Sequence, residues 1–276
     1  MKTNVFPINY FTHIWTPQRV FQGRKLLKWW QIVFVFLFLN GLLMIPISLN
    51  YAKMDDFPAG AYFPETMELI DEDLVGFMQN VEVINGQLRS TADYFRETTE
   101  GIVAVGLMDK DVEAALEKNH VLLFLEDHFV LKEGENPAFT VPYPKTFSFQ
   151  DVTTRAEFQQ LLSDAWFIQN KTYIVFSLTL ITGTISFISM LFIVLGSALI
   201  LYFTKMSKLS SIQTFKESIN LILNCISLAT IVATVIGIIH FNVIVMMMLQ
   251  TIGLIFMLLA VYYKTQLKDE QFDNAG

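Results

Sequence analysis

The longest apolar run of the chain, Tyr173–Phe203, contains thirty-one residues and no charged side chain. At about 1.5 Å per residue, a helix of this length reaches ~46 Å, whereas the hydrocarbon core of a bilayer is roughly 30 Å thick. The run therefore predicts a transmembrane helix with length to spare.

Three further uncharged runs have the length of one membrane span each: Ile32–Leu49, Ser218–Ile239 and Val243–Tyr263. Only three residues separate the last two runs, which predicts a tight helical hairpin. The first run could instead be a cleaved signal peptide. However, the basic region before it is long, and no pair of small residues follows it, so a retained anchor is the better interpretation.

These runs divide the chain into nine predicted segments. They are 1–31 (basic, amphipathic, cytoplasmic), 32–49 (first span), 50–172 (extracytoplasmic domain), 173–203 (second span), 204–217 (cytoplasmic loop), 218–239 (third span), 240–242 (outer turn), 243–263 (fourth span) and 264–276 (cytoplasmic tail).

Positive charge orients the four spans. Lys and Arg gather before the first span, between the second and third (Lys205, Lys208 and Lys216) and after the fourth (Lys264 and Lys268). With four spans, all three places lie on one side of the membrane, and the positive-inside rule makes that side cytoplasmic. The pattern predicts a multi-pass plasma-membrane protein with both termini in the cytoplasm.

The segment 1–31 contains basic residues and no acidic one, and it mixes them with aromatic and aliphatic side chains. Such a segment is typical of a chain that lies along the inner leaflet with its apolar side chains in lipid. The alternative is that its charge acts only as a topology signal.

The segment 50–172 is acidic, because residues 51–171 hold 22 of the 26 Asp and Glu residues of the chain. An acidic surface repels nucleic acid, so no nucleic-acid partner is expected. The single cysteine, Cys225, lies in the third span, which excludes an intramolecular disulfide.

Hydrophobic spacing in the segment 50–172 predicts a small α/β domain. A helix is expected over Glu65–Asn80, and Asn85-Gly86 predicts a hairpin with a type I′ turn between 82–84 and 87–89. The sequence predicts a strand over Gly101–Leu107, a helix over Asp109–Lys118 and a strand parallel to the first over His120–Leu125. An antiparallel strand is expected over 129–132.

The end of this domain suggests a helix that leads into the second span. Thr154 and Glu157 fit a capping box, and apolar residues recur at helical spacing up to Phe167. A break near Gln169-Asn170 is the alternative. The expected fold is thus an all-α four-helix transmembrane bundle with an extracytoplasmic mixed α/β domain inserted between the first and second spans.

The four spans contain no Asp, Glu, Lys or Arg, which disfavours a proton-coupled carrier or an intramembrane protease. Their larger neutral polar residues are Asn40, Asn220, Asn224 and Gln250. These side chains could line a polar path, but interhelical hydrogen bonding is the more usual role. In the third span, Ala229, Ala233 and Gly237 recur every four residues and predict a face for close helix packing.

No pattern typical of catalysis, of cofactor binding or of a metal site is present, and no catalytic, cofactor-binding or metal-binding residue is predicted. The triplet Glu126-Asp127-His128 could contact a divalent cation. However, neighbouring side chains of a strand point to opposite faces, and turns favour such polar residues in any case.

Several stretches of the chain resemble a family of bacterial membrane proteins. The matching sequences are WTPQRVFQGRKLLKWW from Trp15, EVINGQL from Glu82, GIVAVGLMDKDVEAAL from Gly101 and LSSIQTFKESINLILNCISL from Leu209. They are similar to proteins of unknown function labelled maltodextrose (maltodextrin) utilisation protein MalA. The chain departs from the family at Met108-Asp109-Lys110, where an Asp-Thr pair is common. The resemblance implies a link to maltodextrin uptake and supplies no site residues.

We therefore expect a non-catalytic membrane protein that acts through contacts, as an accessory, sensor or scaffold. The expected partners are the lipid bilayer and an ABC-type sugar transporter or another membrane protein. The alternative is an oligomeric transport component that itself passes a solute, with Asn220, Asn224 and Gln250 along its path. An enzyme is the least favoured class.

Overall fold

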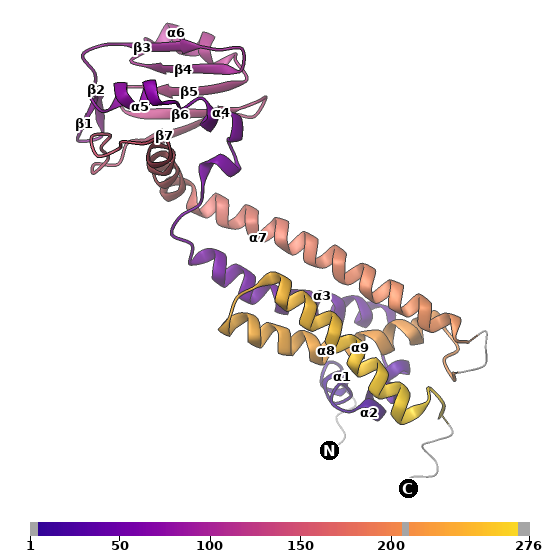
Figure 1. Ribbon diagram of the computed structural model, residues 1–276. Helices are drawn as coiled ribbons and strands as arrows, with labels where there is room; N and C mark the ends of the chain where they lie inside the picture. The colour runs from indigo at the N-terminus through magenta and orange to yellow at the C-terminus, as the bar shows by residue number, and fades with distance from the viewer. Residues whose placement is uncertain (1–4, 206–209, 270–276) are drawn as a thin grey trace. The chain divides into compact units, whose positions relative to one another are not determined.

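A computed structural model describes residues 5–205 and 210–269 of the chain (Figure 1). The chain divides into two units, one formed by Met1–Lys53 with Val175–Gly276 and the other by Met54–Ile174. The first unit is helical, and the second combines short helices with a small sheet. Each unit is described by itself below.

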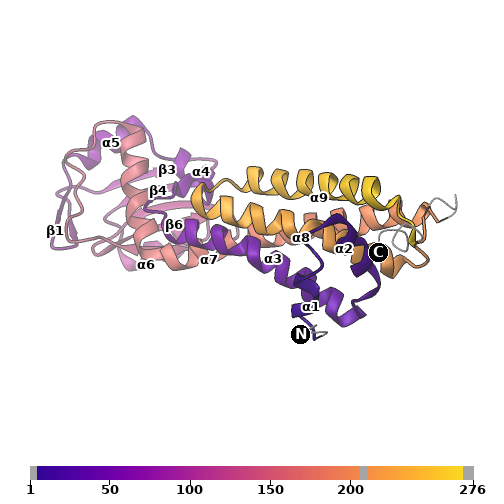
Figure 2. The same cartoon turned by 90° about the horizontal axis from the view of Figure 1, so that it is seen from below.

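Four helices are long and apolar enough to cross a membrane: α3 (Trp29–Ala52), α7 (Arg155–Phe203), α8 (Phe215–Ile239) and α9 (Val243–Thr265). Each contains one of the four predicted spans and extends beyond it. Figures 1 and 2 show α3, α8 and α9 running side by side in the first unit. The coarse prediction of four apolar helices and a small α/β part is therefore confirmed.

The helices α8 and α9 form the predicted hairpin, and side-chain caps define where each begins. The Thr214 hydroxyl accepts a hydrogen bond from the Glu217 backbone N–H at 3.2 Å. The Asn242 side-chain oxygen accepts one from the Val245 N–H at 3.0 Å. Each cap satisfies a backbone donor that the first helical turn leaves without a partner.

The N-terminal segment folds into α1 (Ile8–Phe11), α2 (Pro17–Gln22) and a 3-10 turn, η1 (Gly23–Lys25). Its apolar side chains were expected to lie in lipid, and for five of them this expectation is wrong. Tyr10, Ile14, Val20, Phe21 and Leu27 are buried within the first unit. Hydrophobic spacing reveals an apolar face but not what covers it.

The second unit contains a five-stranded sheet in the order β3-β4-β5-β6-β7. Its strands are β3 (Tyr94–Glu97), β4 (Gly101–Val105), β5 (His120–Phe124), β6 (His128–Glu133) and β7 (Phe139–Pro142). Strands β4 and β5 are parallel, joined by α6 (Asp109–Leu116), and the other pairs are antiparallel. The predicted strand–helix–strand unit is confirmed, whereas β3 was not predicted.

The two faces of this sheet are covered differently. Ala115 of α6 packs with Ile102, Val121 and neighbouring apolar side chains of the sheet. The ring of Phe124 instead contacts that of Phe158 in the first turns of α7, with 5.9 Å between ring centroids. Both faces are therefore apolar, which is why the parallel strands read as uninterrupted hydrophobic runs.

The short hairpin β1 (Glu82–Ile84) and β2 (Gln87–Arg89) is confirmed with its predicted turn. Asn85 and Gly86 have φ angles of 56° and 81°, as a type I′ turn requires. Asparagine and glycine are favoured at these two positions because both adopt positive φ at low cost.

The predicted helix over 65–80 is wrong in one respect, because the structure has two short helices, α4 (Pro64–Glu68) and α5 (Glu72–Met78). Asp71 lies between them in extended conformation, and its carboxylate accepts a hydrogen bond from the Leu74 N–H at 2.9 Å. This cap starts a second helix where the apolar spacing alone indicated a continuous one. A 3-10 turn, η2 (Ala59–Ala61), precedes α4.

Helix α7 begins at the predicted capping box and continues from Arg155 to Phe203 without a break. The Glu157 N–H donates to the Thr154 hydroxyl at 3.2 Å, and the Thr154 N–H donates to the Glu157 carboxylate at 3.0 Å. Two backbone donors that would otherwise lack partners are thus satisfied reciprocally.

Replacing Thr154 with alanine is expected to destabilise the first turn of α7 by about 1 kcal/mol, because one cap is lost. In hydrogen–deuterium exchange of the full chain in detergent, the amides of Glu157 and Phe158, which bond to Thr154, should exchange about fivefold faster. Thr154→Ser keeps the hydroxyl and should exchange like wild type. Equal exchange in the alanine variant would show that the cap does not hold this turn.

Candidate functional site

The N-terminal segment is held by a buried arginine. Arg24 is 2% exposed, and its Nη2 donates to Asp269 Oδ1 at 2.5 Å while its Nη1 donates to the Phe21 carbonyl oxygen at 3.0 Å. Its Nε lies 3.9 Å from Glu217 Oε2, and the guanidinium stacks on the ring of Phe21. A guanidinium removed from water needs such compensation, because an unpaired buried charge is strongly destabilising.

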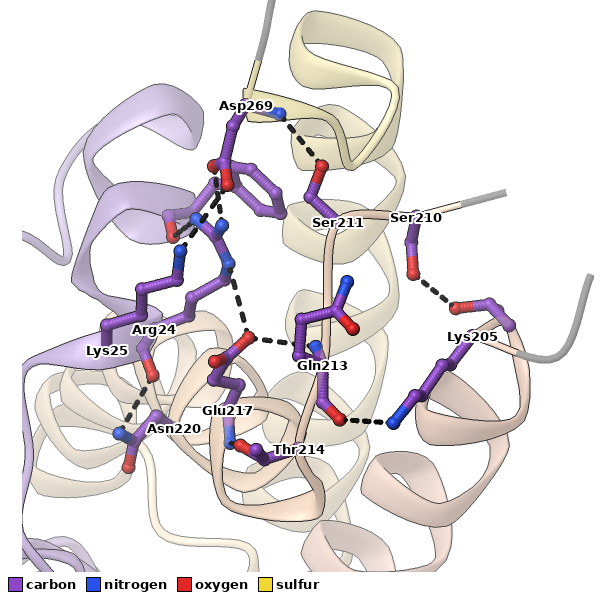
Figure 3. A network of polar contacts seen from close by, with 12 residues as sticks. Arg24, Lys25, Lys205, Ser210, Ser211, Gln213, Thr214, Glu217, Asn220 and Asp269 are labelled. Atoms are coloured by element: carbon purple, nitrogen blue, oxygen red, sulfur yellow. Dashed lines mark hydrogen bonds and ion pairs between the residues drawn. The ribbon is translucent and has the colours of Figure 1, made fainter. Parts of the chain in front are cut away.

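Arg24 joins three segments that are far apart in the sequence (Figure 3). Asp269 follows α9, Glu217 lies in the first turn of α8, and Arg24 itself belongs to the N-terminal segment. Lys25 adds a second, exposed contact, with its Nζ 3.4 Å from Asp269 Oδ2. We call Arg24, Lys25, Ser211, Glu217 and Asp269 the polar junction.

Backbone contacts hold the chain after α9 in the polar junction. Gln266 and Leu267 have φ angles of 46° and 56°, so the chain turns back after the helix. The Ser211 N–H then donates to the Leu267 carbonyl at 2.7 Å, and the Asp269 N–H donates to the Ser211 hydroxyl at 3.1 Å. The loop before α8 and the segment after α9 are therefore tied to each other as well as to Arg24.

Glu217 also organises the loop before α8. Its carboxylate accepts a hydrogen bond from the Gln213 N–H at 3.1 Å, and Lys205 Nζ donates to the Gln213 carbonyl at 2.8 Å (Figure 3). An acidic side chain in the first turn of a helix is stabilised by the helix dipole. Lys208, which we counted in the basic loop, lies outside the described residues.

Asn220 and Asn224 contact the N-terminal segment rather than a path between helices. Asn220 Nδ2 donates to the carbonyl oxygens of Arg24 at 2.9 Å and Leu27 at 3.3 Å, and Asn224 Nδ2 donates to that of Val20 at 3.1 Å. Both side chains are buried. These carbonyls lie at or beyond the last turn of α2 and in η1, where a helix leaves acceptors without partners.

The N-terminal segment has a third polar contact, at Tyr10. Its hydroxyl donates to the Leu223 carbonyl at 3.2 Å and is hydrogen-bonded to the Ser227 hydroxyl. Burial raises the pKa of Tyr10 well above its ordinary value, so the phenol stays protonated as a donor. Tyr10, Asn224 and Asn220 thus hold successive parts of the segment along one face of α8.

Gly23 makes the close approach of this segment to α8 possible. A Cβ atom at this position would lie 2.7 Å from Asn224 Nδ2 and 3.2 Å from the Cβ of His13. Both distances are shorter than ordinary van der Waals contact, so a side chain at position 23 requires the Asn224 amide or the segment to move, and either movement disturbs the bond from Asn224 to Val20.

The remaining intramembrane polar candidates lie in two other contacts. Asn40 on α3 accepts a hydrogen bond from the Ser186 hydroxyl of α7 at 3.4 Å. Gln250 on α9 donates to the Thr230 hydroxyl of α8 at 2.9 Å. The structure therefore brings Asn220 and Asn224 together and keeps Asn40 and Gln250 apart from them.

The predicted small-residue face of α8 lies against α9. A Cβ atom added to Gly253 would be 2.5 Å from the Cβ of Ala229, and one added to Gly237 would be 2.5 Å from Met246 Sδ. Ala233, between them, is completely buried. Small side chains at these positions let the two helix backbones approach closely.

In the second unit, Glu126 and Asp127 lie in the turn between β5 and β6, and His128 is the first residue of β6. His128 Nδ1 lies 2.5 Å from Asp127 Oδ1, and the Asp127 side chain is exposed. Among the described residues, no three His, Cys, Asp or Glu side chains are close enough to one another to hold a metal ion.

Sequence reasoning missed Arg24, Glu217, Asp269 and Gly23 as members of a site. Arg24 is one of several basic residues in the segment 1–31, and any of them could contribute to the topology signal, so the sequence does not single it out. Its partner Asp269 is 245 residues away in the chain. One signal was present, because Glu217 falls in the predicted cytoplasmic loop between Lys205 and the third span, amid basic residues.

Comparison with known proteins relates the whole chain to two curated proteins. The maltodextrose utilization protein MalA of Streptococcus pneumoniae is 27% identical over 270 residues, which cover 97% of this chain and 98% of MalA. The putative maltodextrin utilization protein YvdJ of Bacillus subtilis is 26% identical over 254 residues, covering 88% and 84%. The chain is therefore similar over nearly its whole length to MalA-like proteins. The match to MalA includes the N-terminal segment and both units.

No family model matches the chain, and no solved structure matches it. The polar junction and the Asn220 and Asn224 contacts are therefore described from this structure alone.

Gly23→Ala is expected to release the N-terminal segment, since the added Cβ displaces it from Asn224. Overpacking of this kind typically costs about 1–3 kcal/mol. The purified chain should melt at a lower temperature, and trypsin should cut after Arg24, which is buried in the wild type.

The matched control for this substitution is Gly41→Ala on α3, because no atom lies within 4 Å of the added Cβ there. Alanine is the better helix former, so this variant should be as stable as wild type or slightly more stable. Wild-type melting and trypsin resistance in Gly23→Ala would refute the docking role of position 23.

The Arg24–Asp269 pair predicts a dependence of stability on pH. Desolvation alone would raise the pKa of Asp269, but the hydrogen bond and charge of Arg24, with Lys25, lower it below its ordinary value of 3.8. A carboxyl whose pKa is lower in the folded state stabilises the fold above the unfolded-state pKa, and this contribution disappears as pH falls through the folded-state pKa.

The measurement compares wild type with Asp269→Asn across pH. The melting temperature of wild type should exceed that of the variant at pH 7, and the difference should shrink as the pH is lowered below about 4. Taking the difference removes the contribution of the other carboxyl groups. A difference that is the same at pH 7 and pH 3 would contradict an ionic role for Asp269.

Proposed function

We propose that this chain is a non-catalytic polytopic membrane protein that acts through contacts, as an accessory, sensor or scaffold in maltodextrin uptake. The observation that supports this proposal is that buried polar side chains of the first unit form contacts within the chain. Asn220, Asn224 and Arg24 serve to hold the N-terminal segment to the helices of the same chain. The link to maltodextrin comes from the names of the two relatives.

The proposed threading has both termini in the cytoplasm and the second unit outside. The polar junction supports it, because the N-terminal segment, the loop before α8 and the segment after α9 meet at one end of the first unit. An even number of spans requires these three places to share a side of the membrane. Their excess of Lys and Arg makes that side the cytoplasmic one.

The proposed partner is an ABC-type sugar transporter, contacted by the second unit. Three large apolar side chains in the sheet-containing part of this unit are exposed, Ile84, Phe95 and Met108. Exposed apolar side chains on a polar domain are suitable contacts for another protein. The spans themselves face the lipid bilayer with many exposed apolar side chains on α7 and α9.

The alternative is an oligomeric transport component with a solute path lined by Asn220, Asn224 and Gln250. The placement of these residues weighs against it. The first two donate to backbone carbonyls of the N-terminal segment, and Gln250 donates to Thr230 elsewhere on α8. The proposal of a contact role explains these bonds without a path.

Co-purification tests the proposed partner. The tagged full chain, isolated in mild detergent from native membrane, should bring the subunits of a maltodextrin transporter with it. Changing both Phe95 and Met108 to Ser should reduce this recovery several-fold, whereas Glu113→Ser, an exposed change on α6 of the same unit, should not. Recovery of this chain alone, with and without maltodextrin, would refute the proposal.

Maltodextrin uptake by cells carrying Gln250→Leu separates the two functions. A solute path through Gln250 predicts that uptake is lost in this variant. A contact role predicts wild-type uptake, because the Thr230 hydroxyl keeps its hydrogen bond to the Ile226 carbonyl at 2.9 Å.

A further inference from the structure

A groove of about 310 Å³ lies between α3 and α7 within the first unit. Its lining is mostly apolar and includes Phe176, Leu180 and Phe187 of α7, with Asn40 of α3 at one wall. The groove is open to the outside of the unit, since the side chains of Phe176 and Leu180 are 66% and 58% exposed. It lies within the predicted membrane spans on both helices.

At one point of the groove, the Met44 side chain of α3 reaches the backbone of α7 at Gly183. A Cβ atom on Gly183 would lie 2.8 Å from Met44 Cε, so α7 has no side chain where Met44 of α3 meets it. The larger side chains of Leu180 and Phe187 line the groove on either side of Gly183. Small residues at such crossings are typical of helix packing in membranes.

Asn40 has an unused hydrogen-bond donor in this groove. Its carboxamide oxygen accepts the Ser186 hydroxyl at 3.4 Å, and its Nδ2 has no acceptor among residues 5–205 and 210–269. No water is present in hydrocarbon to satisfy a free amide donor, and a hydrogen bond between helices there is worth about 0.6 kcal/mol. A lipid chain filling the groove offers no acceptor, so an occupant that brings one is favoured.

The rim of the same groove carries a suitable acceptor. The Thr184 side chain is exposed, and its hydroxyl donates to the Leu180 carbonyl at 2.8 Å. Since a hydroxyl has one proton and two lone pairs, this bond leaves the oxygen free to accept. The groove therefore presents a donor, an acceptor, a cavity and two protruding apolar side chains within one surface.

We propose that the groove between α3 and α7 binds the same groove of a second copy of this chain. In a two-fold pair the same patch meets itself, so Asn40 of each copy donates to Thr184 of the other. Leu180 or Phe176 of each copy fills the cavity of its partner. The patch is self-complementary in shape and in hydrogen bonding, which favours a second copy over an unrelated helix.

Disulfide trapping in native membrane tests the surface directly. In a Cys225→Ala background, which removes the single cysteine, Leu180→Cys should form a covalent dimer on oxidation. Leu259→Cys on α9 is the matched control, because both leucines are 58% exposed, and it should stay monomeric. Equal trapping at the two positions, or none at Leu180, would overturn the proposal, as would trapping to a different protein.

The variant Asn40→Leu tests the hydrogen bond. The dimer fraction of the fluorescently labelled chain is measured in phosphatidylcholine–phosphatidylglycerol vesicles at decreasing protein-to-lipid ratio. Loss of two symmetric bonds should weaken dimerisation about eightfold. Gln250→Leu removes a bond internal to α8 and α9 and should leave the dimer unchanged. A wild-type chain that is monomeric at every ratio would show that only lipid occupies the groove.

Discussion

The stability of the first unit depends on the neutralisation of one buried charge, the guanidinium of Arg24. Arg24 is almost completely removed from solvent, and its two acidic partners, Asp269 and Glu217, come from two other segments. The guanidinium is therefore neutralised only when the N-terminal segment, the start of α8 and the chain after α9 meet. Because a buried charge without a partner is strongly destabilising, these segments are expected to assemble together or not at all.

The same requirement explains why α8 is the most enclosed of the four long helices. One part of its surface receives the N-terminal segment through Asn220, Asn224 and Tyr10, and another receives α9 through Ala229 and Gly237. Helix α3 packs on it as well. The helices α7 and α9 are left with broad apolar faces outside the unit, which are the surfaces available to lipid and to partners.

The sequence predicted those parts of the fold that rest on local chemistry. Asn85-Gly86 determined a hairpin turn by its backbone preference, and Thr154 with Glu157 marked the start of α7 through hydrogen bonds three residues apart. The four apolar runs were visible because a membrane span needs length and lack of charge.

The sequence did not reveal the pairings between distant segments. The apolar side chains of α1 and α2 have a pattern that suits lipid as well as α8, and nothing near Arg24 in the sequence indicates Asp269. The break at Asp71 and the edge strand β3 were missed for a related reason. A single capping side chain or a neighbouring strand decided the structure there, against or without a hydrophobic pattern.

The asparagines of the spans show how the same side chain acquires different roles. Asn220 and Asn224 donate their amide protons to carbonyl oxygens of their own chain and are closed off from the outside. Among residues 5–205 and 210–269, Asn40 has a hydrogen-bond partner only at its oxygen, and it lines an open groove. A partner stabilises a polar group in a membrane, so a donor left open by the chain favours an occupant that brings an acceptor. The internal architecture uses the first two asparagines, and the proposed association between molecules would use the third.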